Sequence, residues 1–290
     1  MIYKDAEHWL ASGNKRILLF GMSGVGKTHV SDILRKSGQW FHYSVDYRIG
    51  TRYMGEYIVD NFKREAMRNE FLAELLKTDS IYIASNITFE NLAPLSTYLG
   101  KPGDPGLGGI PYQEYKIRQQ QHRHAEIASL KETKHFVDRA EKIYGYRNFV
   151  CDSGGSICEV VDTNDPSDDL MNTLAEHLLL IWIRESDDHA KQLAERFDRA
   201  PKPMYYHPSF LDRMWSEYCG VKNCRADKVD PDDFVRWIYV RAIERRMPRY
   251  RAMAENWGIQ LYANDIKRIT SASEFCDLVA ASLDDREYRV

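Results

Sequence analysis

The chain has 290 residues, and its 40 basic side chains against 43 acidic ones give a formal net charge of −3. This balance argues against a surface that coats polyanions in general, although it leaves a local basic groove open. Hydrophobic residues make up 43% of the chain and aromatic residues 12%. This composition is sufficient for one large domain or for a core with a sizeable insertion.

Cysteine usage and the apolar runs indicate a cytoplasmic protein. The five cysteines are an odd number at irregular spacing, which is typical of reduced thiols in the cytosol. Residues 1–5 lack the layout of a signal peptide, and the most apolar run, 178–183, is far too short to span a bilayer. We therefore expect no association with a membrane.

The first elements of the chain surround a phosphate-binding pattern. Residues 16–20 predict a buried strand, and residues 29–37 predict a helix that ends at Gly38. Between them stands a stretch that fits the P-loop pattern of Gly, four free positions and Gly-Lys-Thr, namely Gly21-Met22-Ser23-Gly24-Val25-Gly26-Lys27-Thr28. The sequence therefore predicts a nucleotide-binding loop between a strand and a helix.

The residue types in this loop match what a polyphosphate requires. Gly21, Gly24 and Gly26 allow the backbone to turn tightly enough to aim several N–H groups at one anion, and the helix dipole adds positive potential. Lys27 can reach the outer phosphates, and the hydroxyl of Thr28 can bind Mg²⁺. A Gly-rich turn without a binding role would explain the glycines, but it would not explain the Lys-Thr pair.

The middle of the chain predicts a helical region. A strand at 40–45 ends at Asp46, and an apolar periodicity then predicts helix from residue 47 to about 77. Residues 94–111 are rich in Gly and Pro, which is typical of a functional flap or a mobile connection. A long polar helix, broken once, is predicted over 112–144.

Three more strands are predicted at 148–151, 179–183 and 259–262, with helices between them. One of these helices opens at Asp165-Pro166, and another runs from residue 231 to about Met247. The alternation predicts an α/β fold of the P-loop NTPase class, with a doubly wound, mostly parallel five-stranded sheet. We expect the core to comprise 1–54 and 146–290, and a largely helical insertion at 55–145 to form the acceptor-binding or lid region.

Two aspartates follow predicted strands, at the edge of the sheet where ligands bind. Asp152 follows the strand at 148–151, and there it can hold Mg²⁺ together with Thr28. Asp46 suits a general base that accepts a proton from an acceptor hydroxyl, and the two roles can be exchanged. The alternative for Asp152 is a cap on a helix that starts near Ser156.

Arg48 and Arg52 are four residues apart on the helix predicted after Asp46, so both can project to one side. Such a pair can clamp a carboxylate or phosphate of the acceptor. The alternative is a helix cap with a surface ion pair.

This layout resembles the small P-loop kinases, the group that includes shikimate, gluconate, dephospho-coenzyme-A and nucleoside-monophosphate kinases. The resemblance rests on the loop Gly21–Thr28, Asp46, Asp152-Ser153-Gly154-Gly155, the strand 179–183 with Arg184, and Arg196-Phe197-Asp198-Arg199-Ala200-Pro201. It implies a kinase that uses ATP and Mg²⁺, with Arg196 and Arg199 as lid arginines that neutralise charge. It also implies that Gly154 and Gly155 line the acceptor pocket.

The chain departs from this group in several respects. The lid is compact, the residue before Asp46 is Val45, and the double-aspartate pattern of shikimate-type members is missing. The insertion at 55–145 is also much larger than their usual acceptor-binding segment. The resemblance therefore does not identify the acceptor, which we expect to be a small molecule or a nucleotide.

Two alternatives remain open at the level of the sequence. Val45-Asp46-Tyr47-Arg48 is similar to a segment of polynucleotide 5′-kinases and zeta-toxin-like kinases, which would make RNA or a nucleotide sugar the acceptor. Asp152-Ser153-Gly154-Gly155 also fits the Asp-x-x-Gly pattern of nucleotide-dependent switches, and an ATPase without an acceptor would share it. No Asn-Lys-x-Asp motif for reading guanine occurs in the chain, which favours ATP.

Overall fold

The computed structural model describes residues 1–185, 195, 197–199 and 201–287. The chain forms two compact units. The first unit comprises Met1–Val45, Ile127–Ala200 and Arg236–Val290, and the second comprises Asp46–Glu126 and Pro201–Val235. The insertion expected at 55–145 coincides with the second unit over 55–126, whereas 201–235 joins this unit from later in the chain.

The first unit contains a five-stranded sheet in the order β2-β3-β1-β4-β5, and all neighbouring strands are parallel. Its strands are β1 (Arg16–Phe20), β2 (Trp40–Ser44), β3 (Asn148–Asp152), β4 (Leu179–Arg184) and β5 (Gly258–Tyr262). All five lie where the sequence predicts them to within a residue or two. The predicted α/β class with a parallel five-stranded sheet is thus confirmed.

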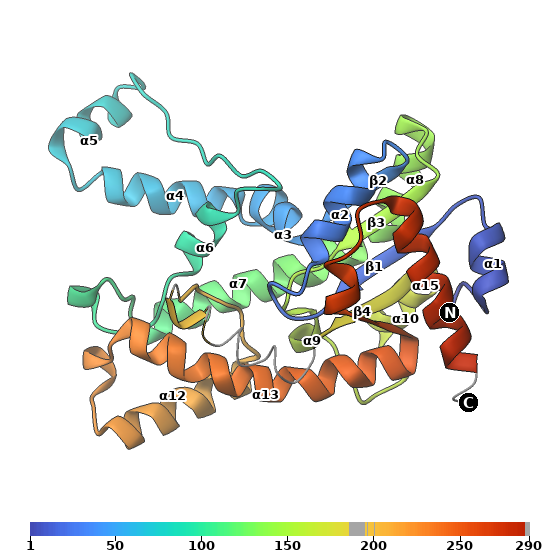
Figure 1. Ribbon diagram of the computed structural model, residues 1–290. Helices are drawn as coiled ribbons and strands as arrows, with labels where there is room; N and C mark the ends of the chain where they lie inside the picture. The colour runs from blue at the N-terminus through green and yellow to red at the C-terminus, as the bar shows by residue number, and fades with distance from the viewer. Residues whose placement is uncertain (186–194, 196, 200, 288–290) are drawn as a thin grey trace. The chain divides into compact units, whose positions relative to one another are not determined.

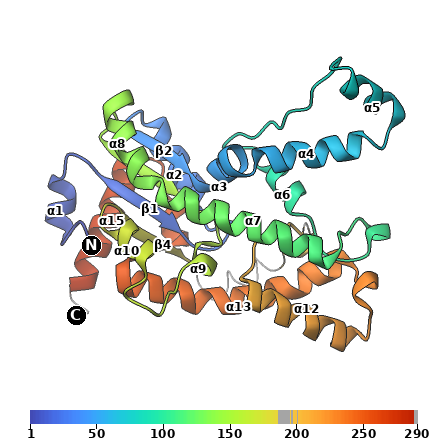
Figure 2. The ribbon, with the colours of Figure 1, turned by 180° about the vertical axis from the view of Figure 1, so that it is seen from behind.

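Helices cover both faces of this sheet. α2 (Lys27–Lys36) and α15 (Ala272–Glu287) pack on one face (Figure 1). α8 (Thr133–Tyr144) and α10 (Asp169–Ala175) pack on the other face, which Figure 2 shows from behind. The shorter helices of the unit are α1 (Ala6–Ala11), α9 (Ile157–Val160) and α14 (Ala263–Ile266).

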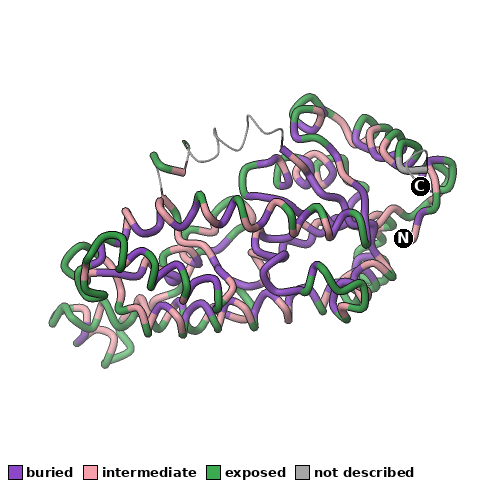
Figure 3. Tube along the Cα trace, turned by 90° about the horizontal axis from the view of Figure 1, so that it is seen from below, coloured by how far each residue is buried: buried purple, intermediate pink, exposed green. Residues whose placement is uncertain are grey.

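Burial explains why the central strands read as continuous apolar runs. Leu179, Leu180, Ile181 and Ile183 of β4 are 0% exposed. Figure 3 shows the chain coloured by burial, with the buried residues in purple. A strand covered on both faces has no solvent side that requires polar residues, so the alternating pattern disappears.

The strand order makes the end of β1 a switch point. β1 lies between β3 and β4, the chain leaves β1 for β2 on the β3 side, and it later crosses from β3 to β4. In doubly wound sheets, ligands bind outside the carboxyl ends of the strands at such a point. The loop after β1 begins there.

The regular secondary structure of the second unit is helical in its described residues, apart from an isolated bridge between Pro102 and Ile110. The predicted helical region from residue 47 to 77 forms four segments, which are α3 (Val45–Arg48), the π-helix η1 (Ile49–Tyr53), α4 (Gly55–Ala66) and α5 (Glu70–Lys77). Then follow α6 (Ala93–Leu99), η2 (Pro105–Leu107), α12 (Pro208–Lys222) and η3 (Ala226–Lys228). α7 (Tyr112–Lys131) ends before Glu132, so the break predicted between 112 and 144 is confirmed.

Two predicted helix boundaries are wrong. The helix expected at Asp165-Pro166 begins at Asp169, because Asp168 rather than Asp165 caps it, with Met171 N donating to its carboxylate at 2.9 Å. The helix expected to end near Met247 is α13 (Pro231–Trp257), which continues through Pro248. Pro248 has no N–H to donate to the carbonyl of Glu244, and Glu244 is an exposed residue.

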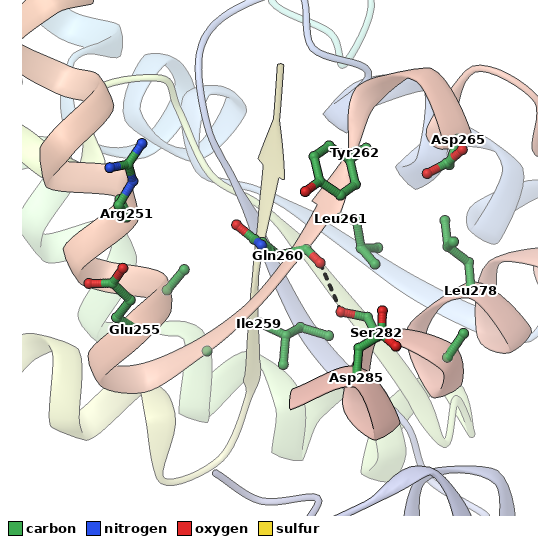
Figure 4. Close-up of a pocket in the computed structure, with 13 residues that line it drawn as sticks. Arg251, Glu255, Ile259, Gln260, Leu261, Tyr262, Asp265, Leu278, Ser282 and Asp285 are labelled. Carbon is green, nitrogen blue, oxygen red and sulfur yellow. Dashed lines mark hydrogen bonds between the residues drawn. The ribbon is translucent and has the colours of Figure 1, made fainter. Parts of the chain in front are cut away.

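A groove of about 610 Å³ follows the edge strand β5 between α13 and α15 (Figure 4). Arg251 and Glu255 of α13 line one side, and Ser282 and Asp285 of α15 line the other. The hydroxyl of Ser282 donates to the carbonyl oxygen of Gln260 at 2.8 Å. A side chain of α15 therefore occupies a main-chain acceptor of the edge strand.

All five cysteines lie in described residues, and the structure has them as free thiols. Among the helices of the described residues, none combines the length and the apolar character that crossing a bilayer requires.

His42 on β2 should make stability depend on pH. Burial, together with the charge of Arg35, lowers the pKa of His42 from 6.5 to about 4, although Asp32 opposes the shift. Between these values the unfolded chain binds a proton that the folded chain rejects, so the free energy of unfolding falls as pH falls from 6.5 to 4. In urea unfolding, His42→Phe should lose this component. A difference between variant and wild type that stays constant across that window would contradict the prediction.

Candidate functional site

The loop after β1 adopts a conformation that only glycine accommodates readily. Gly21, Gly24 and Gly26 have φ values of +136°, +90° and +108°. A Cβ on Gly21 would lie 2.6 Å from the carbonyl oxygen of Ile183, and one on Gly26 would lie 2.8 Å from Cγ2 of Ile266. The three glycines therefore satisfy the tight turn that the sequence predicts.

Helix α2 begins directly after this loop. Gly26 is its N-cap residue and supplies no side-chain cap, while Val30 N donates to Gly26 O at 3.0 Å. The first amide groups of a helix have no partner within the helix, and together with the dipole they favour an anion. Of the other residues in the candidate phosphate-binding stretch, Met22 and Val25 are buried and Ser23 is exposed.

Lys27 lies over the loop that precedes it. Its side chain is almost entirely buried, and Nζ donates to the carbonyl oxygens of Gly21 at 2.9 Å and Met22 at 3.0 Å. A buried ammonium group requires hydrogen-bond partners, and an oxygen that carries negative charge stabilises it more than a carbonyl does. The arrangement keeps a positive charge beside the amides of the loop.

Thr28 and Asp152 bring two oxygen ligands together next to Lys27. Thr28 Oγ1 donates to Asp152 Oδ2 at 3.2 Å. Asp152 is the last residue of β3 and is paired with Leu19 of β1, so the parallel sheet itself brings the carboxylate to the loop. Burial and the neighbouring charge of Asp152 raise the pKa of the Cys151 thiol well above its ordinary value, so this thiol remains protonated.

These two residues fit Mg²⁺ but do not enclose it. A hydroxyl and a carboxylate are the hard oxygen ligands that Mg²⁺ prefers, and Mg²⁺ commonly binds through one or two such groups plus phosphates. The described residues contain no cluster of three or more His, Cys, Asp or Glu side chains that could hold a metal. The site therefore suits a magnesium ion that arrives with a polyphosphate.

The glycine segment after β3 lies against the loop. Ser153 anchors it, because its N–H and its hydroxyl both donate to Leu19 O, at 3.1 and 2.8 Å. A Cβ on Gly155 would lie 3.3 Å from Ser23 N and 3.6 Å from Gly21 O, and Gly154 beside it is buried. The structure thus brings the predicted residues Gly154 and Gly155 to the backbone of the loop.

The remaining predicted residues belong to the second unit, are exposed in the first unit, or fall outside the described residues. Asp46 and Arg48, both half-buried on α3, and the exposed Arg52 on η1 belong to the second unit. Met54 N donates to Ile49 O at 2.8 Å, which is the wider turn of a π-helix, so the helix after Asp46 is regular only to Arg48. Arg199 is exposed in the first unit, and Arg196 lies outside the described residues. Their expected roles stay predictions.

Sequence reasoning missed three residues near the loop, namely Glu159, Arg246 and Tyr250. Arg246 and Tyr250 lie on α13 and donate to the carbonyl oxygen of Gly155, and Glu159 accepts from Arg246. The spacing of four residues between Arg246 and Tyr250 was the available signal, but charged residues on a predicted helix are more often solvated than part of a site.

Comparison with known proteins adds little to this geometry. No protein-family model matches the chain, and no curated protein matches it. A crystal structure of shikimate kinase from Bacteroides thetaiotaomicron is similar with 13% sequence identity and a TM-score of 0.38, covering 95% of this chain and 97% of that one. A similarity at this TM-score supports no conclusion about the chain, so the site is interpreted from its own residues.

Proposed function

We propose that the chain binds ATP with Mg²⁺ at the loop 21–28 and transfers the γ-phosphoryl group to a small-molecule or nucleotide acceptor. One observation carries the proposal: at the end of the central strand, Lys27 bonds to the backbone of the glycine loop, and Thr28 beside it bonds to Asp152. Phosphoryl transfer relies mainly on positioning and on neutralising charge, which such a constellation provides.

The loop and the two residues beside it then have defined tasks. Nζ of Lys27 exchanges the carbonyl oxygens of Gly21 and Met22 for phosphate oxygens, while the loop amides hold the phosphates in place. Thr28 and Asp152 hold Mg²⁺, which when bound neutralises charge on the phosphates.

The acceptor side of the proposal rests on the sequence. Asp46 takes the proton of an acceptor hydroxyl, and Arg48 and Arg52 bind an anionic group of the acceptor. Gly154 and Gly155 line the acceptor pocket. Arg196 and Arg199 neutralise charge as it develops on the transferred group.

Lys27→Ala should weaken the binding of Mg·ATP by at least about tenfold, because it removes a charged donor to the phosphates. Titration of a fluorescent ATP analogue measures the effect. The matched control is Lys36→Ala on the same helix. The side chain of Lys36 is 71% exposed, and its Nζ lies 2.6 Å from Oδ2 of Asp32 in a surface ion pair. Equal affinity in both variants would refute the nucleotide site.

ATP consumption with pooled metabolites, nucleotides or RNA tests the kinase step itself. A kinase consumes ATP much faster once its acceptor is present, and the phosphorylated product identifies that acceptor. If Lys27→Ala abolishes ATP consumption but none of the pools increases it in the wild-type protein, the protein is an ATPase instead.

A further inference from the structure

A buried ion-pair cluster connects α13 with the segment that follows β3. Glu159 of α9 accepts from Arg246 Nε at 3.1 Å and from Arg245 Nε at 3.2 Å. Both Glu159 and Arg246 are 1% exposed. Burial by itself would raise the pKa of Glu159, but the two arginines outweigh it and hold the pKa below its ordinary value. The carboxylate is thus charged at neutral pH, and it fixes the direction of the Arg246 guanidinium.

Arg246 and Tyr250 together hold one carbonyl group. Arg246 Nη1 donates to Gly155 O at 3.0 Å, and the hydroxyl of Tyr250 donates to the same oxygen at 2.5 Å. Burial raises the pKa of Tyr250 well above its ordinary value, so its hydroxyl keeps the proton that it donates. The two residues are four apart on α13, which places them on one face of the helix.

The same carbonyl group belongs to the residue that lies against the phosphate-binding loop. The Cβ position of Gly155 is 3.3 Å from Ser23 N, a closer approach than side chains usually make. The hydroxyl of Tyr250 also lies 3.8 Å from Sδ of Met22. Because Gly155 has no side chain, its backbone passes close to that of Ser23, and a movement of Gly155 would change its spacing from the loop that is proposed to bind the phosphates.

Arg249 provides a comparison within the same helix. Its Nε donates to Cys158 O at 2.8 Å and its Nη2 to Val161 O at 2.9 Å. These bonds join the same two segments as those of Arg246, but they end on α9 and on Val161 rather than on Gly155. Replacing Arg249 therefore weakens the attachment of α13 without touching a bond to Gly155, whereas replacing Arg246 affects both.

We infer that Arg246 and Tyr250 are positioning residues for the phosphate-binding loop: by holding the carbonyl group of Gly155, they set the backbone around Ser23 and thereby the affinity for a nucleotide. Glu159 acts through Arg246. The inference rests on the proposed function, because it assigns these residues to the same nucleotide site. Buried networks in which every member is hydrogen-bonded fix a single arrangement, which a loop of several amides around one anion requires.

Three substitutions test the inference, namely Arg246→Lys, Tyr250→Phe and Arg249→Lys. Lysine keeps the charge beside Glu159, but its single nitrogen lacks the fork that reaches both the carboxylate and Gly155. Tyr250→Phe removes only the hydroxyl. We expect the dissociation constant for Mg·ATP to rise about tenfold in Arg246→Lys and roughly fivefold in Tyr250→Phe, and to change less than about twofold in Arg249→Lys.

The measurement includes thermal unfolding of each variant, and binding is titrated well below every unfolding midpoint. A merely structural role would lower the midpoints of the two lysine variants alike and leave the affinities equal, which would overturn the inference. If Arg246→Lys does not fold, Tyr250→Phe decides the matter by itself. Failure of the wild-type chain to bind any nucleotide would instead refute the proposed function, so the two failures are distinguishable.

Discussion

Glu159→Ala is expected to destabilise the protein by about 3–5 kcal/mol, the range for breaking a buried ion pair from one side. The substitution leaves the guanidinium of Arg246, which is 1% exposed, without its carboxylate. Removal of one partner costs more than the pair contributes, because the remaining charge cannot return to water. Urea unfolding followed by tryptophan fluorescence measures the loss.

The control for this prediction is Glu141→Ala. Glu141 is 61% exposed and lies 3.7 Å from Arg16. Exposed ion pairs contribute about 0–1 kcal/mol, so this variant should unfold at nearly the wild-type urea concentration. Similar losses in the two variants would mean that the Glu159 cluster is not isolated from water as the structure has it.

Gly21→Ala is expected to abolish nucleotide binding and to lower the free energy of unfolding by about 2 kcal/mol or more. The new Cβ would lie 2.6 Å from the carbonyl oxygen of Ile183, at a φ of +136° that side chains rarely adopt. Because that oxygen belongs to the backbone of β4, it cannot move aside as a flexible side chain can. The loop must shift instead, and its amides are then no longer aimed at one anion.

The matched control is Gly13→Ala, since nothing lies within 4 Å of a Cβ at Gly13. This variant should remain within about 0.5 kcal/mol of wild type and bind nucleotide normally. Urea unfolding and titration of the fluorescent ATP analogue are measured on both variants. Normal binding by Gly21→Ala would contradict the requirement for glycine at the start of the loop.

The strands and the loop could be predicted because their determinants are local. Residues 179–183 form one apolar run whatever surrounds them. The glycines and the Lys-Thr pair that define the loop all lie within the eight residues from Gly21 to Thr28. The order of the strands was not predicted, because an apolar run records burial and not its neighbours. Only the structure places β3 between β2 and β1.

Contacts distant in the sequence account for what could not be predicted. Arg246 and Glu159 are 87 positions apart, and each alone reads as a solvated charge. The end of α13 was misjudged at Pro248 for a related reason. Arg246 and Tyr250, on either side of the proline, are fastened to Gly155, so tertiary bonds continue a helix that local propensity would end.

The hydroxyl of Ser282 has a consequence for the protein at high concentration. Sheets with open borders recruit strands from neighbouring molecules and can grow into fibrils. On β5, a recruited strand would first have to displace the hydroxyl of Ser282 from the carbonyl of Gln260 (Figure 4). A serine that takes no part in the proposed chemistry thus competes with strand pairing at that edge.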